Sequence, residues 1–269
     1  MEDGGRVLVL SAEEGMVAHM ARGECVIGVR SGEDLPPLPG GCYLVDEEES
    51  VDAAFADRVY ARFRHKPWKI GENDDLLLRE FSTDDIAPLY LLEQEMRDHP
   101  AISGILGELT ETPWDELDPG SREALAQKLS SYIEHQYAFY EYGVWGIWLK
   151  SEGCFVGMCG FSVTEDAPSL GYYISPAYRR RGFATQCCRM ALDFVEDWVQ
   201  VDEVSAKIDR ENFASLCIVR SLGFMEMKGD GQQLKFIKRL AGEPTVTDNT
   251  QPDALWDKIR SAAGKQFRS

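Results

Sequence analysis

The chain has 269 residues, 44% of them hydrophobic, so it is long enough to build one large domain or two smaller ones around an apolar core. Its apolar runs are all far shorter than the about 20 residues that a membrane-spanning helix needs, which excludes an integral helical membrane protein. With 28 Lys and Arg against 46 Asp and Glu, the net charge of −18 disfavours general binding to nucleic acid, because such a protein repels the phosphate backbone.

Residues 1–70 are expected to form a small α/β domain of unknown role. The first residues, MEDGG, are acidic where a signal peptide would be basic, so we expect a cytoplasmic protein. Apolar strand patterns alternate with helix patterns, which indicates a parallel sheet. The expected strands are Val7–Leu10, Cys25–Val29 and Cys42–Val45, and the expected helices are Ala12–Arg22 and Val51–Phe63.

A second domain is expected over residues 71–240, because Pro67 and the charged turn 71–75 mark a boundary. It begins with a strand at Leu76–Arg79 and a helix that Ser82 caps and that runs toward Met96. After a loop over Pro113–Pro119, a helix is expected at Arg122–Tyr140, ended by Gly143. Residues 241–269 read as a linker followed by a helical pattern over 253–263, which either docks or stays loose.

From Val144 the apolar spacing changes to the alternation that is typical of strands. Val144–Lys150 and Cys154–Val163 are expected to form an antiparallel pair around a glycine-containing turn. A third strand, Leu170–Ile174, ends before Pro176.

The segment that follows is basic and contains a glycine before a helix pattern. Arg179, Arg180 and Arg181 supply charged donors, and Gly182 allows close approach of the backbone to a ligand. The helix beyond presents free N–H groups and the positive end of its dipole. The sequence therefore predicts an anion-binding site at this turn.

The cysteines and histidines give no sign of a metal site or a disulfide scaffold. Seven cysteines form an odd set without a C-x-x-C pair, and the four histidines are scattered. Cys187, Cys188 and Cys217 lie on apolar helical stripes, so we expect them to pack in the core.

The pattern Arg179-x-x-Gly182-x-Ala184 resembles the acetyl-CoA pyrophosphate loop of the GNAT superfamily of N-acetyltransferases. The order downstream also resembles that family: a strand at Glu203–Asp209, then Asn212-x-x-Ser215, then Leu222-Gly223-Phe224. The last two segments look most like the branch that contains the ribosomal-protein N-terminal acetyltransferases and their relatives that modify small molecules. The resemblance covers about residues 74–240, so the N-terminal unit is an addition to the common fold.

The resemblance implies a mixed α/β (α+β) fold in which a central mixed sheet, flanked by helices, splays into a V and holds acetyl-CoA as co-substrate, with no metal. The backbone of Tyr172–Ile174 would pair with the pantetheine amides, the N–H groups of Arg181–Thr185 would hold the pyrophosphate, and Arg179 or Arg180 would reach a phosphate. The residues implied to bind the cofactor are Tyr172, Tyr173, Ile174, Arg179, Arg180, Arg181, Gly182, Phe183, Ala184, Thr185, Asn212 and Ser215.

The implied reaction is direct attack of a primary amine on the thioester in a ternary complex, which needs a base and an acid. Many family members use a tyrosine where this chain has Val219, so Ser215 is the candidate acid, unless its hydroxyl only caps the helix. Glu165 is the candidate base, with Asp166, Glu141 and Tyr142 as alternatives.

The acceptor of the acetyl group is a small molecule or a protein N-terminus, and the acidity of the chain favours a cationic one. The same acidity is also explained by solubility. A homodimer is compatible with the sequence. The competing hypothesis is a regulatory protein that binds CoA or a partner and has lost the chemistry, which the missing tyrosine favours.

Overall fold

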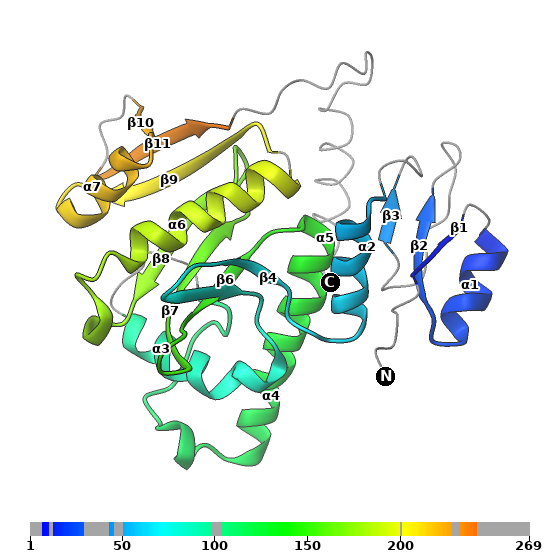
Figure 1. Cartoon of the computed structure of the whole chain (residues 1–269). Coiled ribbons are helices and arrows are strands. Elements are labelled where there is room, and N and C mark those ends of the chain that lie inside the picture. Colours follow the sequence, from blue (N-terminus) through cyan, green and yellow to red (C-terminus); the bar gives the residue numbers. More distant parts are fainter. Residues whose placement is uncertain are drawn as a thin grey trace.

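The computed structural model describes residues 7–10, 13–29, 43–45, 51–97, 104–199, 201–227 and 232–240. The turn-rich break at 32–41 and the tail at 241–269 lie outside the described residues. The described residues form two separate sheets, one of three strands and one of eight. In Figure 1 the three-stranded unit (blue) lies beside the central domain, and helix α2 is on the side that faces α5.

The N-terminal unit is a parallel sheet in the order β1-β2-β3, as the alternation of strands and helices predicted. Cys25, Ile27 and Val59 are the buried residues at its centre. Its elements are β1 (Val7–Leu10), α1 (Glu13–Ala21), β2 (Cys25–Val29), β3 (Tyr43–Val45) and α2 (Ala53–Phe63).

The eight-stranded sheet has the order β10-β11-β9-β8-β7-β6-β5-β4. Neighbouring strands are antiparallel except β8 and β9, which are parallel. The strands are β4 (Lys69–Glu72), β5 (Leu76–Arg79), β6 (Val144–Leu149), β7 (Cys154–Ser162), β8 (Ser169–Ile174), β9 (Glu203–Asp209), β10 (Met225–Glu226) and β11 (Gln233–Arg239). The second half of β4, residues 71–72, was expected to belong to a turn, and because β4 pairs with β5 the sheet begins before residue 71.

Strands β8 and β9 separate almost as soon as they meet. Ser169 pairs with Ser205, and the Ser205 N–H donates to the Pro168 carbonyl at 2.8 Å. Over residues 170–174 of β8 the register gives no further partner on β9, whereas β7 pairs with β8 along its whole length. The sheet is therefore splayed at its centre, which is the V that the resemblance implied.

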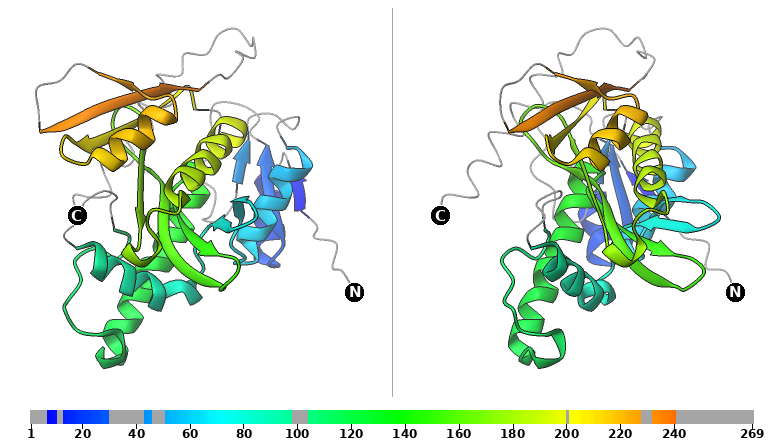
Figure 2. Two further views of the ribbon diagram at one scale, coloured as in Figure 1. Left: turned by 60° about the vertical axis from the view of Figure 1, so that its left-hand side comes forward. Right: turned by 90° about the vertical axis from the view of Figure 1, so that its left-hand side faces the viewer.

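Helices cover both faces of this sheet. On one face α3 and α4 pack over Val144, Met158 and Tyr173, and on the other α6 packs over Trp145 and Cys159. In Figure 2 the strands β9–β11 lie at one end of the molecule and α3 and α4 at the other. The helices are α3 (Ile86–Met96), α4 (Pro119–Tyr132), α5 (Ala138–Tyr140), α6 (Phe183–Phe194) and α7 (Phe213–Ser221), with short 3-10 turns at Thr83–Asp85, Trp114–Glu116 and Pro176–Tyr178 and π turns at Ile133–Tyr137 and Val195–Val199. None of the helices in the described part of the chain is long and apolar enough to cross a membrane.

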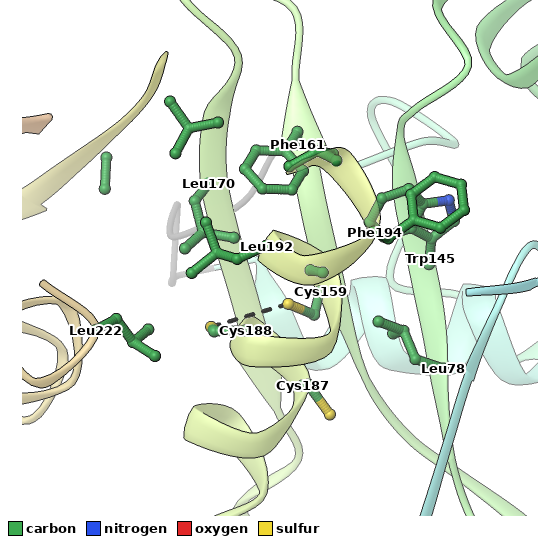
Figure 3. Close-up of a cluster of buried hydrophobic side chains, with 14 of the residues drawn as sticks. Leu78, Trp145, Cys159, Phe161, Leu170, Cys187, Cys188, Leu192, Phe194 and Leu222 are labelled. Atoms are coloured by element: carbon green, nitrogen blue, oxygen red, sulfur yellow. Dashed lines mark hydrogen bonds between the residues drawn. The ribbon is translucent and has the colours of Figure 1, made fainter. Parts of the chain in front are cut away.

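The cysteines divide according to the face of the helix that carries them. Cys187 and Cys188 belong to the buried face of α6, and the Cys188 thiol lies 3.9 Å from the Cys159 thiol of β7 (Figure 3). Cys217 is exposed, so its predicted place in the core was wrong. On α7 the buried positions are Leu216 and Val219. Cys217 follows Leu216 directly, so its side chain is rotated by about 100° around the helix axis from the buried direction.

The π turn between α4 and α5 brings two tyrosines to the same backbone segment. The Val144 N–H donates to the Tyr132 hydroxyl at 2.6 Å, and the Tyr137 hydroxyl donates to the Val144 carbonyl at 2.6 Å. Both polar groups at the start of β6 are thereby satisfied by side chains of one helical segment.

Two arginines of α2 join the N-terminal unit to the central domain. Arg62 donates to Glu80 at 2.6 Å and to Glu141 at 2.9 Å, and Arg58 donates to Glu141 at 2.8 Å. Arg62 also donates to the Tyr43 hydroxyl at 2.9 Å, and burial raises the pKa of Tyr43 to about 12. Since Arg58 and Glu80 are almost fully buried, this junction is a desolvated charge network.

Candidate active site

A cavity of about 480 Å³ opens where β8 leaves β9, between the basic turn, the start of α6 and α7. Every residue that the sequence implied for cofactor binding lines it, apart from Arg181. Arg181 instead lies over the Tyr178 ring, 5.4 Å from its centre. The lining residues are Tyr172, Tyr173, Ile174, Tyr178, Arg179, Arg180, Gly182, Phe183, Ala184, Thr185, Asn212, Ala214, Ser215 and Ile218.

The register of β8 decides which backbone groups face this cavity. The Ser175 N–H donates to the Val156 carbonyl of β7 at 3.0 Å, and in an antiparallel ladder the bonded residues alternate. Tyr173 therefore directs its backbone groups toward β7, whereas Tyr172 and Ile174 direct theirs toward the open splay. Backbone pairing with a ligand along β8 is limited to these two residues, and the Ile174 carbonyl already accepts from Arg179 Nε at 2.8 Å.

The turn before α6 adopts the backbone that an anion site needs. Arg180 and Gly182 both have positive φ, 63° and 80°. The Gly182 carbonyl accepts the first hydrogen bond of the helix, from the Gln186 N–H at 3.2 Å, so the N–H groups of Phe183, Ala184 and Thr185 have no partner inside the helix. Such a set of N–H groups at a helix start, next to residues of positive φ, favours an anion.

Arg179 is positioned by its neighbours on β8. Its guanidinium lies 5.1 Å from the centre of the Tyr173 ring, and its Nε is held by the Ile174 carbonyl. The Tyr173 hydroxyl in turn donates to Glu95 of α3 at 2.8 Å. Arg179 lines the cavity, where a guanidinium is suited to a phosphate.

Ser215 and Tyr172 meet across the splay. The Tyr172 hydroxyl donates to Ser215 Oγ at 2.8 Å, and burial raises the pKa of Tyr172 above its ordinary value. Asn212 caps α7 by accepting the Ser215 N–H at 3.1 Å, as its place in the sequence predicted. The sequence named Tyr172 for its backbone alone, because nothing local links its hydroxyl to a residue 43 positions later.

A second cavity, of about 260 Å³, shares Tyr172, Asn212 and Ser215 with the first. It reaches along β9 to Asp209 and to Gln233 of β11. Asp209 supplies a carboxylate here that the sequence analysis did not consider; its Oδ1 accepts the Glu211 N–H at 2.8 Å. The pair Tyr172 and Ser215 thus belongs to the wall of both cavities.

The expected general bases are not brought to these cavities. Glu165 and Asp166 are exposed in the loop between β7 and β8, and Asp166 accepts from Lys235 of β11 at 2.6 Å. Glu141 is paired with the two arginines of α2, and Tyr142 is buried against Phe161. Val219, where the resemblance implied a tyrosine in many family members, is buried at the wall of the second cavity, and its side chain has no hydroxyl to act as an acid. Among the residues that the structure describes, no group of His, Cys, Asp and Glu is arranged to hold a metal ion.

Comparison with known proteins gives one family and a set of similar folds. The family model described as "Acetyltransferase (GNAT) domain" matches residues 75–225. The ribosomal-protein-S5-alanine acetyltransferase from Vibrio fischeri is 16% identical with a TM-score of 0.50, over 63% of this chain and 96% of that chain. RimL, a ribosomal L7/L12 alpha-N-protein acetyltransferase solved in complex with coenzyme A, is 15% identical with a TM-score of 0.50, over 64% of this chain and 98% of that chain.

An acetyltransferase from Salmonella typhimurium, solved with its cofactor acetyl-CoA, is 17% identical with a TM-score of 0.47, over 65% of this chain and 99% of that chain. At such identities the likenesses to the two ribosomal-protein acetyltransferases show the fold alone.

Proposed function

Because this chain belongs to the GNAT acetyltransferase family, we propose that it moves the acetyl group of acetyl-CoA to a primary amine by direct attack in a ternary complex. The observation that carries the proposal is the first cavity, which joins the open edge of β8 to the start of α6. It combines partners for amides at one end with partners for phosphates at the other. Acetyl-CoA has both kinds of group in this order along its length.

In the proposed complex the pyrophosphate lies on the N–H groups of Phe183–Thr185, and Arg179 or Arg180 reaches a phosphate oxygen. The pantetheine amides pair with the backbone of Tyr172 and Ile174. The thioester then lies near Ser215, whose hydroxyl is the donor for the charge that develops on sulfur.

The acceptor amine occupies the second cavity, which shares Ser215 with the first. It needs a base that removes a proton from the ammonium before attack. Asp209 lines this cavity, whereas Glu165, the residue favoured by the sequence, would act only after a displacement of its loop. We therefore favour Asp209 as the base and keep Glu165 as the alternative. The net charge of −18 supports a cationic acceptor, either a small molecule or a protein N-terminus.

Calorimetric titration with acetyl-CoA tests the first cavity. Gly182→Asp places a negative charge at the proposed pyrophosphate site. Gly182→Asn is the matched control, because both variants must adopt the same φ of 80° and their side chains have nearly the same shape. Asn tolerates this backbone better than most residues. We expect acetyl-CoA to bind the Asp variant at least about tenfold more weakly than the Asn variant, or about 1.4 kcal/mol. Equal affinities would contradict the assignment.

Release of coenzyme A, followed with a thiol reagent across a panel of amines, tests the transfer itself. Turnover that falls in Asp209→Asn and persists in Glu165→Gln supports Asp209 as base, and the reverse supports Glu165. The buried Val219 in place of the family tyrosine favours the competing function, a protein that binds CoA without chemistry. Tight binding with no turnover for any amine would establish that second reading.

A further inference from the structure

Tyr172 lies between the two cavities and makes a hydrogen bond that the proposed reaction has not yet used. We propose that Tyr172 is a positioning residue: its hydroxyl occupies the acceptor side of Ser215 Oγ and thereby directs the single Ser215 proton toward the sulfur of the thioester. The inference rests on the proposed function, because it assigns a role within that site.

The geometry leaves the Ser215 proton few places to go. A serine hydroxyl has one proton and two lone pairs, and the Tyr172 hydroxyl at 2.8 Å uses one lone pair. The Ser215 backbone is fixed in the first turn of α7 by the Asn212 side chain at 3.1 Å. With the backbone fixed and the Tyr172 side of Oγ filled, the proton is directed away from Tyr172, on a residue that lines both cavities.

Tyr172 is suited to this role because it remains a donor at neutral pH. Its ring lies among buried groups of the sheet, and this burial keeps the pKa of its hydroxyl above the ordinary value, so the phenol stays protonated. A side chain that titrated near neutral pH would alternate between donor and acceptor, and the direction of the Ser215 proton would then no longer be fixed. A phenol of raised pKa is, by the same reasoning, a poor source of the transferred proton itself.

The proton balance of the reaction needs no proton from either hydroxyl. The amine loses one proton to the base before attack, its nitrogen forms the new bond to the acetyl carbon, and the carbon–sulfur bond breaks with its electron pair on sulfur. The second amine proton ends on the thiolate. Ser215 stabilises the sulfur charge by a hydrogen bond during this step, and Tyr172 keeps that bond aligned.

A double-mutant cycle measures the coupling. We expect Ser215→Ala to lower kcat about 100-fold and Tyr172→Phe about tenfold, with the Kd of acetyl-CoA unchanged in both. In the Ser215→Ala background, Tyr172→Phe should cause no further loss, because its effect passes through Ser215. Tyr90→Phe is the matched control, since it removes the hydroxyl of a buried tyrosine that lines neither cavity and donates to the Thr112 carbonyl at 2.7 Å. Independent, multiplicative losses would overturn the proposal.

A second measurement uses no amine, so it separates this inference from the proposed function. The thiol of bound coenzyme A is titrated by its ultraviolet absorbance, with desulfo-coenzyme A as the blank. A hydrogen bond from Ser215 to sulfur should make the bound thiol ionise at lower pH in the wild type. Ser215→Ala should raise that pH because it removes the bond, and Tyr172→Phe should raise it by a smaller amount because it only misaligns the bond. If the wild type and Tyr172→Phe titrate alike, the inference is refuted. If they differ while no amine turns over, the inference stands and the proposed transfer fails.

Discussion

Replacing Arg62 by methionine would remove the cation that α2 inserts between Glu80 and Glu141. Glu141 would keep Arg58 at 2.8 Å, but within the described parts of the chain Glu80 would keep only the Trp68 N–H, at 3.1 Å. The Glu80 side chain is 2% exposed, so the variant would bury a carboxylate without a cation. The loss of stability should therefore come from the unpaired Glu80 carboxylate and from the weakened junction between the N-terminal unit and the central domain.

The expected cost is about 3–5 kcal/mol, the range for removing one partner of a buried ion pair. An exposed pair provides the scale: Arg220 and Glu226 lie 3.0 Å apart with half-exposed side chains, so Arg220→Met should cost only about 0–1 kcal/mol. The additional change Glu80→Gln should restore part of the stability of Arg62→Met, since it removes the unpaired charge and leaves an oxygen for the Trp68 N–H.

Urea unfolding of the wild type, Arg62→Met, Arg220→Met and the double variant Arg62→Met/Glu80→Gln gives their free energies of unfolding by linear extrapolation. The dependence on pH gives a further test, because burial raises the pKa of Glu80 above its value in the unfolded chain. Protonation then favours the folded state, so the deficit of Arg62→Met should shrink as the pH falls through the raised pKa. A cost for Arg62→Met no greater than that for Arg220→Met, or a deficit that does not change with pH, would refute the reasoning.

Three further predictions concern other parts of the molecule. Burial raises the pKa of Glu93, whose carboxylate accepts the Leu106 N–H at 3.1 Å, so wild-type stability should fall as the pH rises through that pKa. Glu93→Gln should flatten the fall of Tm as the pH rises above the ordinary range of a glutamate pKa, and equal slopes would contradict this. Arg79→Lys should destabilise the protein by about 1.5–3 kcal/mol in urea, because lysine cannot reproduce the two hydrogen bonds to Asp85 or the contact with the Trp148 ring. A maleimide should label Cys217 in the native protein before Cys159, Cys187 or Cys188, which peptide mapping would check.

The cofactor side of the site could be predicted because its chemistry is local. Gly182 with a positive φ, the arginines before it and the start of α6 follow one another in the chain, so spacing alone places them together. The Tyr172–Ser215 contact joins residues that lie 43 positions apart in the chain. The two side chains meet because β8 and β9 separate after Ser169. Glu165 was expected at the site because it follows a strand, but the end of a strand does not fix the direction of the loop that leaves it.

The strands were predicted where their apolar residues alternate without interruption. β4 contains Gly71 and charged ends, which read as a turn until β5 supplies its partner. β11 does alternate, with Leu234 and Phe236 buried, so its strand pattern was present in the sequence although no strand was predicted there. The wrong prediction for Cys217 shows that a shift of one position along a short helix is enough to turn a side chain from the core to solvent.

The π turn at Ile133–Tyr137 has a consequence for how this chain tolerates insertions and deletions. A π turn is equivalent to one extra residue in an α-helix, so deleting a residue within it would leave a regular helix of good local geometry. Everything after the deletion would nevertheless rotate by about 100°, and Tyr137 could no longer reach the Val144 carbonyl while Tyr132 held its N–H. The extra residue is therefore part of the length that this segment must have, and a shortened homologue would need a different partner for the first residue of β6.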